Sequence, residues 1–139
     1  MDFSHTMSAA ETVETFFNGG AVLVQLPSHG DQRGQLIPCE LSRFFAPVRT
    51  FLVHDVPEGT VRGGHAHRTA RQLMICLVGR VVVELRLAGE MARVHLDRPA
   101  KALLVEPGVW ASQTYHGDAQ LLVLASEPYD PDDYIDRDL

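Results

Sequence analysis

The chain is poor in the residues on which several classes of protein depend. Cysteine occurs only twice, at Cys39 and Cys76 and in no paired motif, so we expect no disulfide framework. No apolar segment approaches the roughly 20 residues that a transmembrane helix needs. The N-terminal segment lacks the basic start and apolar core of a signal peptide, so we expect a cytoplasmic protein that does not associate with membranes.

Lysine is almost absent, and the excess charge is negative. Lys101 is the only lysine among 12 basic residues, and the formal net charge is -6. This balance argues against nonspecific binding to nucleic acid or to an anionic membrane. The remaining cations are arginines, whose guanidinium forks match phosphate and carboxylate oxygens in a bidentate manner. A GC-rich genome would explain most of the bias, and a few arginines remain candidates for a phosphorylated ligand.

The rest of the sequence is typical of a small β-protein. Its 139 residues suit one compact domain. A pattern like a capping box at Ser8–Glu11, followed by apolar residues and a stop at Asn18-Gly19-Gly20, predicts a short N-terminal helix. We assign residues 1–20 to an N-terminal extension and residues 21–139 to the domain. Short apolar or alternating runs separated by Gly and Pro turns then predict an all-β sandwich or barrel. These runs are 21–26, 49–54, 73–78, 81–87, 93–96, 102–105 and 120–125.

The most informative segment holds two histidines, His65 and His67, between glycines. Residues at i and i+2 of a strand project from the same face, so the two imidazoles reach one point in space. The segment reads Gly59-x5-His65-x-His67-x4-Gln72-x6-Gly79. This spacing fits the first motif of the cupins, small jelly-roll β-barrels, except that Gln72 stands where the metal-binding cupins have glutamate.

A metal centre is not expected at this pair. The second cupin motif, which supplies the last histidine ligand, corresponds to 106–111, where Ala111 occupies the ligand position. Two histidines alone bind a divalent ion weakly. We therefore predict no metal and no cofactor, and we interpret His65 and His67 as groups that transfer protons near neutral pH. A vestigial metal site is the alternative interpretation. His54, on the strand before the motif, is a minor candidate for the same site.

Beyond the histidine motif, most of the chain resembles the cupin sugar 3,4-ketoisomerases, which act on dTDP-4-keto-6-deoxyglucose. The similarity extends from about Val22 to Ile135. It includes Asp31-x-Arg33-Gly34-x-Leu36, Asp55-Val-Pro57, Arg62-Gly-Gly-His65-Ala-His67, Val109-Trp110, Leu122-Val-Leu-Ala-Ser126 and Asp133-Tyr134-Ile135.

The resemblance implies an enzyme that needs no metal and forms a homodimer, usually with exchanged N-terminal strands. In such enzymes a base removes the C3 proton of a dTDP-linked 4-keto sugar, and reprotonation of the enediol at C4 leaves the ketone at C3. His65 and His67 match the acid–base histidines, Arg62 an arginine beside them, and Trp110 a tryptophan at the mouth of the pocket.

The chemistry of the substrate suggests further binding residues. The enediolate needs hydrogen-bond donors, which Arg62, Arg49 or Gln72 supply. The pyrophosphate needs arginine forks, for which Arg33 and Arg62 are candidates. Trp110 is a candidate for stacking on thymine, and packing at the barrel end is the equal alternative.

The sequence also departs from the family and leaves other functions open. Phe51 and Leu52 stand where a tyrosine is usual, which leaves His54 as the nearest polar replacement, and Ala111 follows Trp110 where histidine is common. Tyr129 and Tyr134 are expected to pack the tail rather than touch substrate. The alternatives are a keto-sugar nucleotide epimerase, a non-catalytic sugar-binding cupin and a metal-dependent dioxygenase.

Overall fold

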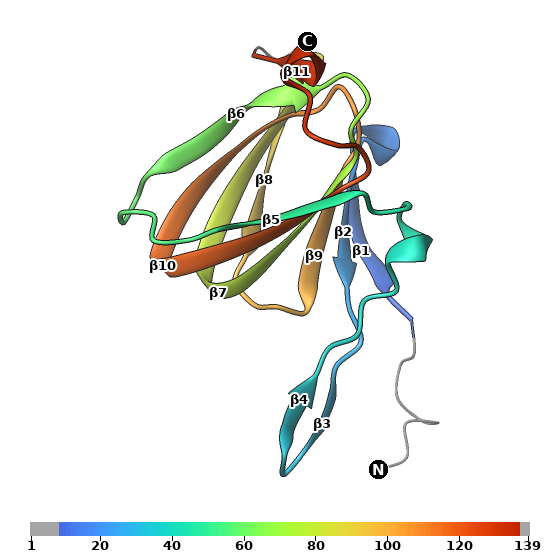
Figure 1. The fold of residues 1–139 in the computed structure, drawn as a ribbon, viewed down its shortest axis with the longest axis vertical. Helices are drawn as coiled ribbons and strands as arrows, with labels where there is room; N and C mark the ends of the chain where they lie inside the picture. Colours follow the sequence, from blue (N-terminus) through green and yellow to red (C-terminus); the bar gives the residue numbers. More distant parts are fainter. Residues whose placement is uncertain (1–8, 137–139) are drawn as a thin grey trace.

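The computed structural model describes residues 9–136, which form strands and short 3-10 turns and contain no α-helix. None of these residues belongs to a helix able to cross a membrane. Figure 1 shows how the strands wrap around a common interior. The strands are β1 (Glu11–Phe16), β2 (Ala21–Gln25), β3 (His29–Asp31), β4 (Gly34–Leu36), β5 (Arg49–Val53), β6 (Val61–His67), β7 (Gln72–Leu87), β8 (Glu90–Leu96), β9 (Lys101–Val105), β10 (Trp110–Ala125) and β11 (Tyr134–Ile135); the 3-10 turns are η1 (Phe17–Gly19), η2 (Leu41–Arg43) and η3 (Pro131–Asp133).

Two long antiparallel strands, β7 and β10, organise the barrel. The first half of β7 pairs with β9 and its second half with β8, while β10 pairs with β6 along its first half and with β5 along its second. Both strands bend where Gly79, at φ +72°, meets Gly117, at φ +68°. A Cβ on Gly79 would lie 2.5 Å from the carbonyl oxygen of Gly117, so only glycine permits this approach. Each long strand therefore belongs to both walls of the barrel.

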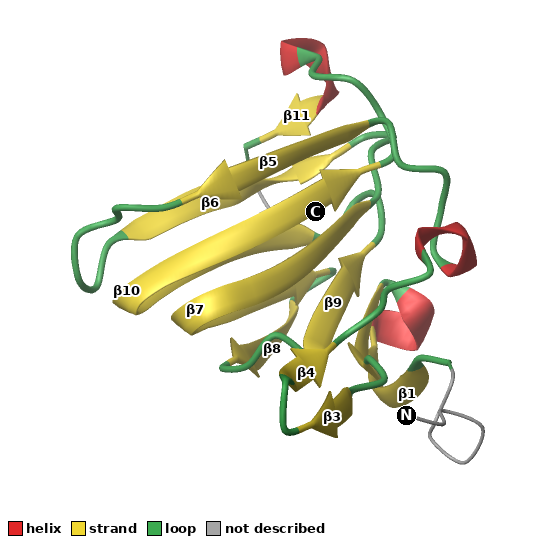
Figure 2. Cartoon of the chain, turned by 60° about the horizontal axis from the view of Figure 1, so that its bottom comes forward, coloured by secondary structure: helices red, strands yellow, loops and turns green. Residues whose placement is uncertain are grey.

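The result is an all-β jelly roll, as the sequence predicts. The nine-stranded sheet runs β1-β2-β9-β7-β10-β6-β11, with β5 and β8 added on β10 and β7. Figure 2 shows β5, β6, β10 and β7 side by side. The main core fills one part of the interior with the inward residues of β7, β8, β9 and β10, among them Val83, Leu85, Leu103 and Leu121. The other part is hollow.

The predicted N-terminal helix is wrong. Residues 11–16 form strand β1, which pairs antiparallel with β2. Thr12, Val13 and Thr15 are β-branched and favour a strand, and the free edge of β2 offers a ladder that an exposed helix would lack. Ser8, the first residue of the capping pattern, lies outside the described residues. The division of the chain at residue 20 stays a prediction.

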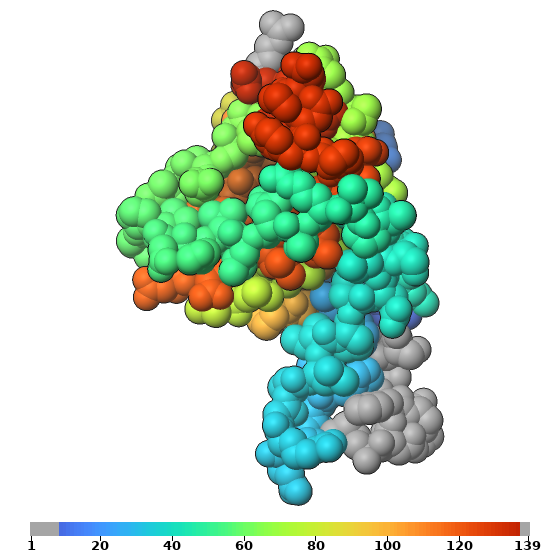
Figure 3. Space-filling view, viewed as in Figure 1, coloured from blue at the N-terminus to red at the C-terminus, as the bar shows by residue number. Residues whose placement is uncertain are grey.

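One hairpin, made of β3 and β4, lies apart from the barrel. Its strands pair only with each other within residues 9–136. It projects away from the sheets, as the ribbon and the space-filling view both show (Figures 1 and 3). The segment that follows returns to the barrel, where Ile37, Leu41, Phe44 and Phe45 cover the outer face of the sheet in a second core cluster.

Candidate active site

A β-bulge in β6 creates the site. In a regular strand residues 62 and 65 would face opposite sides, because side chains alternate. Here the register with β10 shifts, so that Arg62 pairs with Gln113 and His65 pairs with Ala111. Gly63 and Gly64, at φ +80° and +85°, take up the extra residue. Arg62 and His65 therefore both face the interior, together with Gln113.

The interior holds a cavity of ≈ 470 Å³. Five of the residues that line it were predicted from the sequence as site residues, and the structure brings them together: Arg49, His54, Arg62, His65 and Gln72. The remaining lining is contributed by Phe51, Leu52, Val53, Gly63, Met74, Ala111, Gln113, Tyr115, Leu121, Val123 and Tyr134. A hollow of this size with a few convergent polar groups has the character of a small-molecule site.

The two histidines lie beside each other and under one tyrosine. The His65 and His67 ring centroids are 5.2 Å apart, and the Tyr134 ring is 4.5 Å from the first and 4.6 Å from the second. His67 lines a small adjoining pocket rather than the large cavity. Arg49, Gln72 and Tyr134 line both spaces, so His67 lies just behind the cavity wall.

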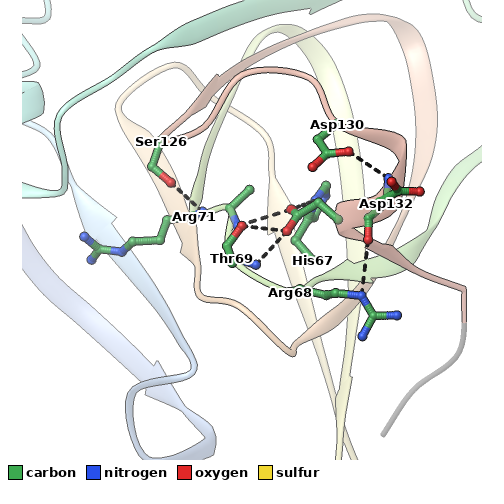
Figure 4. Close-up of polar contacts among 9 residues, drawn as sticks. His67, Arg68, Thr69, Arg71, Ser126, Asp130 and Asp132 are labelled. Atoms are coloured by element: carbon green, nitrogen blue, oxygen red, sulfur yellow. Dashed lines mark hydrogen bonds and ion pairs between the residues drawn. The ribbon is translucent and has the colours of Figure 1, made fainter.

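Asp133 fixes the orientation of His67. Its carboxylate lies 3.1 Å from His67 Nδ1 and accepts hydrogen bonds from the Thr69 hydroxyl, the Thr69 amide and the Ala70 amide. Figure 4 shows the surroundings of this network, with His67 and Thr69 labelled and hydrogen bonds dashed. Asp133 is ionised and already accepts three hydrogen bonds. Nδ1 of His67 therefore carries the ring proton and donates a hydrogen bond to Asp133. Nε2 of His67 is then the free acceptor. It is buried and has no hydrogen-bond partner in the described structure.

The environment keeps both imidazoles neutral. Burial lowers the pKa of His65, and the neighbouring His67 lowers it further. Burial also lowers the pKa of His67, although Asp133 opposes the shift. Burial would raise the pKa of Asp133, but its hydrogen bonds from Thr69, Ala70 and His67 hold the pKa below the ordinary value. The site therefore holds neutral bases next to an ionised carboxylate at neutral pH.

Two of the predicted binding residues lie outside this cavity. Trp110 is on the opposite face of β10, in a separate groove with Val82 and His95, where the Arg86 guanidinium lies 5.1 Å from its ring. Alternation along the strand explains this, because Trp110 is adjacent to the inward-facing Ala111. Arg33 lies on the projecting hairpin, paired with Asp31, and its side chain is 74% exposed.

Four residues of the site were not predicted from the sequence. Gln113 and Tyr115 continue the inward alternation from Ala111, a signal that strand patterning could have supplied. Asp133 and Tyr134 lie in a polar tail that gives no periodic signal. There η3 and β11 return the chain to β6, where Tyr134 pairs with His67. Tyr134 was expected only to pack the tail, whereas it lines the cavity.

Among residues 9–136, no three His, Cys, Asp or Glu side chains gather closely enough to hold an ion. Gln72 and Ala111 both line the cavity near His65, at the two positions where a metal-binding cupin would have glutamate and histidine.

Fold and site together define a jelly-roll cupin whose cavity carries a histidine pair equipped for proton transfer. Comparison with known proteins agrees and is more specific. The chain belongs to the family described as FdtA: WxcM-like, C-terminal, whose model matches residues 20–139.

Individual relatives carry names that describe a reaction. The chain is 35% identical over 108 residues to a TDP-4-oxo-6-deoxy-alpha-D-glucose-3,4-oxoisomerase of Aneurinibacillus thermoaerophilus, which covers 76% of this chain and 78% of the relative. It is also similar to the 3,4-ketoisomerase QdtA of Thermoanaerobacterium thermosaccharolyticum, solved as a histidine-to-asparagine mutant with TDP-4-keto-6-deoxyglucose. That match has a TM-score of 0.80 and 31% identity, over 85% of this chain and 88% of the other.

A dTDP-4-dehydrorhamnose 3,5-epimerase of Bacillus anthracis shares the fold, with a TM-score of 0.80. Its identity is 19%, over 91% of this chain and 82% of the other. At that identity the similarity shows a shared fold and gives no evidence about the reaction.

Proposed function

We propose that this chain is a sugar nucleotide 3,4-ketoisomerase of deoxysugar biosynthesis, which converts TDP-4-keto-6-deoxyglucose to the 3-keto isomer. The observation that carries the proposal is the histidine pair at the cavity, with His67 oriented by Asp133. The names of the Aneurinibacillus relative and of QdtA support the substrate, since both name this sugar nucleotide or its reaction.

The reaction needs only proton transfer. The C4 ketone acidifies the proton on C3, a base takes that proton, and the electron pair moves into a C3–C4 double bond as the C4 oxygen becomes an enediolate. The enediolate oxygen on C4 then takes up a proton, the C3 hydroxyl loses its proton, a proton is added to C4, and the ketone stands at C3. Atoms and electrons balance without an external oxidant or reductant.

The geometry supports a division of these tasks between the histidines. His67 is the better base, because Asp133 fixes its tautomer and leaves Nε2 as an unpaired acceptor. We assign it the removal of the C3 proton, with Tyr134 displaced from the wall that separates it from the cavity. His65, which lines the cavity, exchanges the second proton.

Donors around the cavity stabilise the enediolate. Arg62, Arg49 and Gln72 all line it. The Arg49 guanidinium is held 4.7 Å from the Phe51 ring and 5.1 Å from the Tyr129 ring, so it is positioned before substrate arrives. Donors that are already oriented stabilise developing charge without reorganisation during the reaction. His54 lies at the same wall, beside Asp55, and remains a candidate contact.

The position of Arg33 supports a second copy of the chain at the nucleotide end of the substrate. Arg33 lies on a hairpin that projects from the barrel and pairs only with Asp31 among the described side chains. We infer a homodimer in which this hairpin reaches the partner's cavity and Arg33 binds the pyrophosphate. Trp110 faces away from the cavity of its own chain, so within one subunit it does not stack on the thymine.

Substitution of the two histidines tests the function. His67→Asn and His65→Asn preserve size and polarity but remove the basic nitrogen. Each is expected to lower turnover of TDP-4-keto-6-deoxyglucose by at least about 100-fold. TDP affinity, measured by calorimetry, should change less than about twofold, because neither histidine is placed at the nucleotide. Wild-type-like turnover in either variant would contradict the assignment.

A further inference from the structure

Tyr115 is the most deeply buried polar side chain of the cavity lining. It is 1% exposed and is the largest of the fully buried side chains. Its ring packs into the main core with residues such as Cys76, Val81 and Leu121, while the residue also lines the cavity. Its backbone is pinned to the β5–β6 loop, since the Gly59 amide donates to its carbonyl and its amide donates to that of Thr60.

The hydroxyl of Tyr115 lacks a hydrogen-bond partner within the described residues. None of the hydrogen bonds among residues 9–136 involves Tyr115 Oη, and its neighbours in the core are apolar. The hydroxyl is not among the buried side-chain atoms that lack a partner, so it keeps access to the open cavity that Tyr115 lines. The hydroxyl is therefore available for a partner that enters the cavity.

The position of Tyr115 along β10 indicates what that partner is. Ala111 pairs with His65, and Tyr115 follows four residues later, about 13 Å away along an extended strand. Arg62 and Gln113 lie between these two levels on the same face. A pyranose with its reacting carbons near the histidines directs its far side toward Tyr115. Burial raises the pKa of Tyr115 to about 12, so the phenol stays protonated and can donate.

We propose that Tyr115 contacts the substrate: its phenolic O–H donates a hydrogen bond to an oxygen of the bound keto sugar, at the end of the cavity remote from the histidine pair. The assignment rests on the proposed function for the identity of the sugar. Tyr115 thereby becomes a determinant of specificity, because a sugar without an oxygen at that end would leave the donor unpaired.

The substitution Tyr115→Phe isolates the hydroxyl. It keeps the ring, so the core stays filled. Affinity for TDP-4-keto-6-deoxyglucose, measured by calorimetry on the His67→Asn background to prevent turnover, is expected to fall about 5- to 10-fold, the size of one net hydrogen bond. Affinity for TDP alone should not change. The melting temperature should not fall, because no protein group loses a partner.

Thr114→Val is the matched control, because it removes the hydroxyl of the preceding residue of β10, which lines a separate groove and not the large cavity. It should bind both ligands like the parent protein. The binding assay separates this proposal from the proposed function: a wild-type protein that binds the sugar nucleotide without isomerising it fails the function and still tests Tyr115. Equal binding by Tyr115→Phe and its parent, an equal loss for TDP alone, or a lowered melting temperature with unchanged binding would overturn the proposal.

Discussion

At the scale of single residues, the contact between Asp133 and His67 decides how the site works. A neutral histidine presents one donor and one acceptor, and the carboxylate determines which nitrogen is which. The four contacts of Asp133 also join η3 to the end of β6 and the residues that follow it, so one side chain both orients the base and closes the tail over the barrel.

Replacing Asp133 should impair catalysis more than binding. Asp133→Asn keeps the shape but removes the charge and one acceptor, so the favoured tautomer of His67 is lost. We expect kcat to fall at least about tenfold with little change in KM. Asp132→Asn is the matched control, because Asp132 is the exposed neighbour whose described hydrogen bonds use only its backbone. Steady-state kinetics of both variants check this, and equal effects would contradict a specific role for Asp133.

The dependence of activity on pH follows from the lowered histidine pKa values. His67 must be neutral to accept a proton, and its pKa in the folded protein lies below the ordinary 6.5. As pH falls from neutral, the decline of kcat/KM should therefore have its midpoint below 6.5. Asp133 raises the pKa of His67, so Asp133→Asn should move this decline to still lower pH. A decline centred above 6.5 in the wild type would contradict the account.

Some residues of the site could be predicted from the sequence, and others could not. His65, His67, Arg62, Arg49 and Gln72 could be predicted because a short, spaced motif and a strand pattern carry them. Asp133 and Tyr134 could not, because their place depends on a tail that folds back across some 65 residues of sequence to reach β6. A local pattern contains no information about such a return.

At the scale of elements, the bulge in β6 is what lets Arg62 and His65 share one cavity. A Cβ on Gly63 would lie 2.5 Å from Gln113 Oε1 and 3.1 Å from the Ala111 carbonyl oxygen. The glycine is thus required twice, once for its positive φ and once for the close approach of β10. The sequence predicted tight turns at these glycines, but it did not predict that they bring residues three apart to the same face.

Substitution of Gly63 tests the role of the bulge. Gly63→Ala should lower the free energy of unfolding by roughly 2 to 4 kcal/mol through backbone strain and overpacking. It should also lower kcat/KM, because Gln113 and Arg62 are displaced. Gly89→Ala is the control, since Gly89 has φ +81° and open space around it. It should cost only about 1 kcal/mol, with normal activity. Denaturant titration and kinetics check both variants, and similar results for the two would contradict the role of the bulge.

Other elements show where local patterns and tertiary pairing diverge. The runs 73–78 and 81–87 were predicted as separate strands because Gly79 interrupts them, yet they form one strand, β7, which bends at that glycine and stays paired with β10. The N-terminal segment was predicted as a helix and forms β1. The strand that pairs with β7 along its whole length is β10, which is distant in sequence. β1 pairs with the next strand, β2, a contact that the local capping pattern does not reveal.

At the scale of the whole molecule, the separation between Arg33 and the cavity predicts sites shared between subunits. We expect a dimer by analytical ultracentrifugation and a loss of TDP affinity of about tenfold in Arg33→Ala. Arg33→Ala and His67→Asn, each weak alone, should complement each other when co-expressed. About half of the dimers are then mixed. In each mixed dimer one site combines the intact His67 of one subunit with the intact Arg33 of the other, so about one quarter of the wild-type activity returns. No gain over the sum of the separate variants would contradict a shared site.

Isomerisation in deuterium oxide tests the central claim most directly. The purified, chelator-treated protein is incubated with TDP-4-keto-6-deoxyglucose in this solvent, and the sugar is followed by proton NMR. We predict a 3-keto product with deuterium at C4, which would also give the configuration at that carbon, and no such product with His67→Asn. A substrate that neither isomerises nor exchanges its C3 proton would contradict the ketoisomerase assignment. Deuterium at a carbon other than C3 or C4 would instead indicate an epimerase.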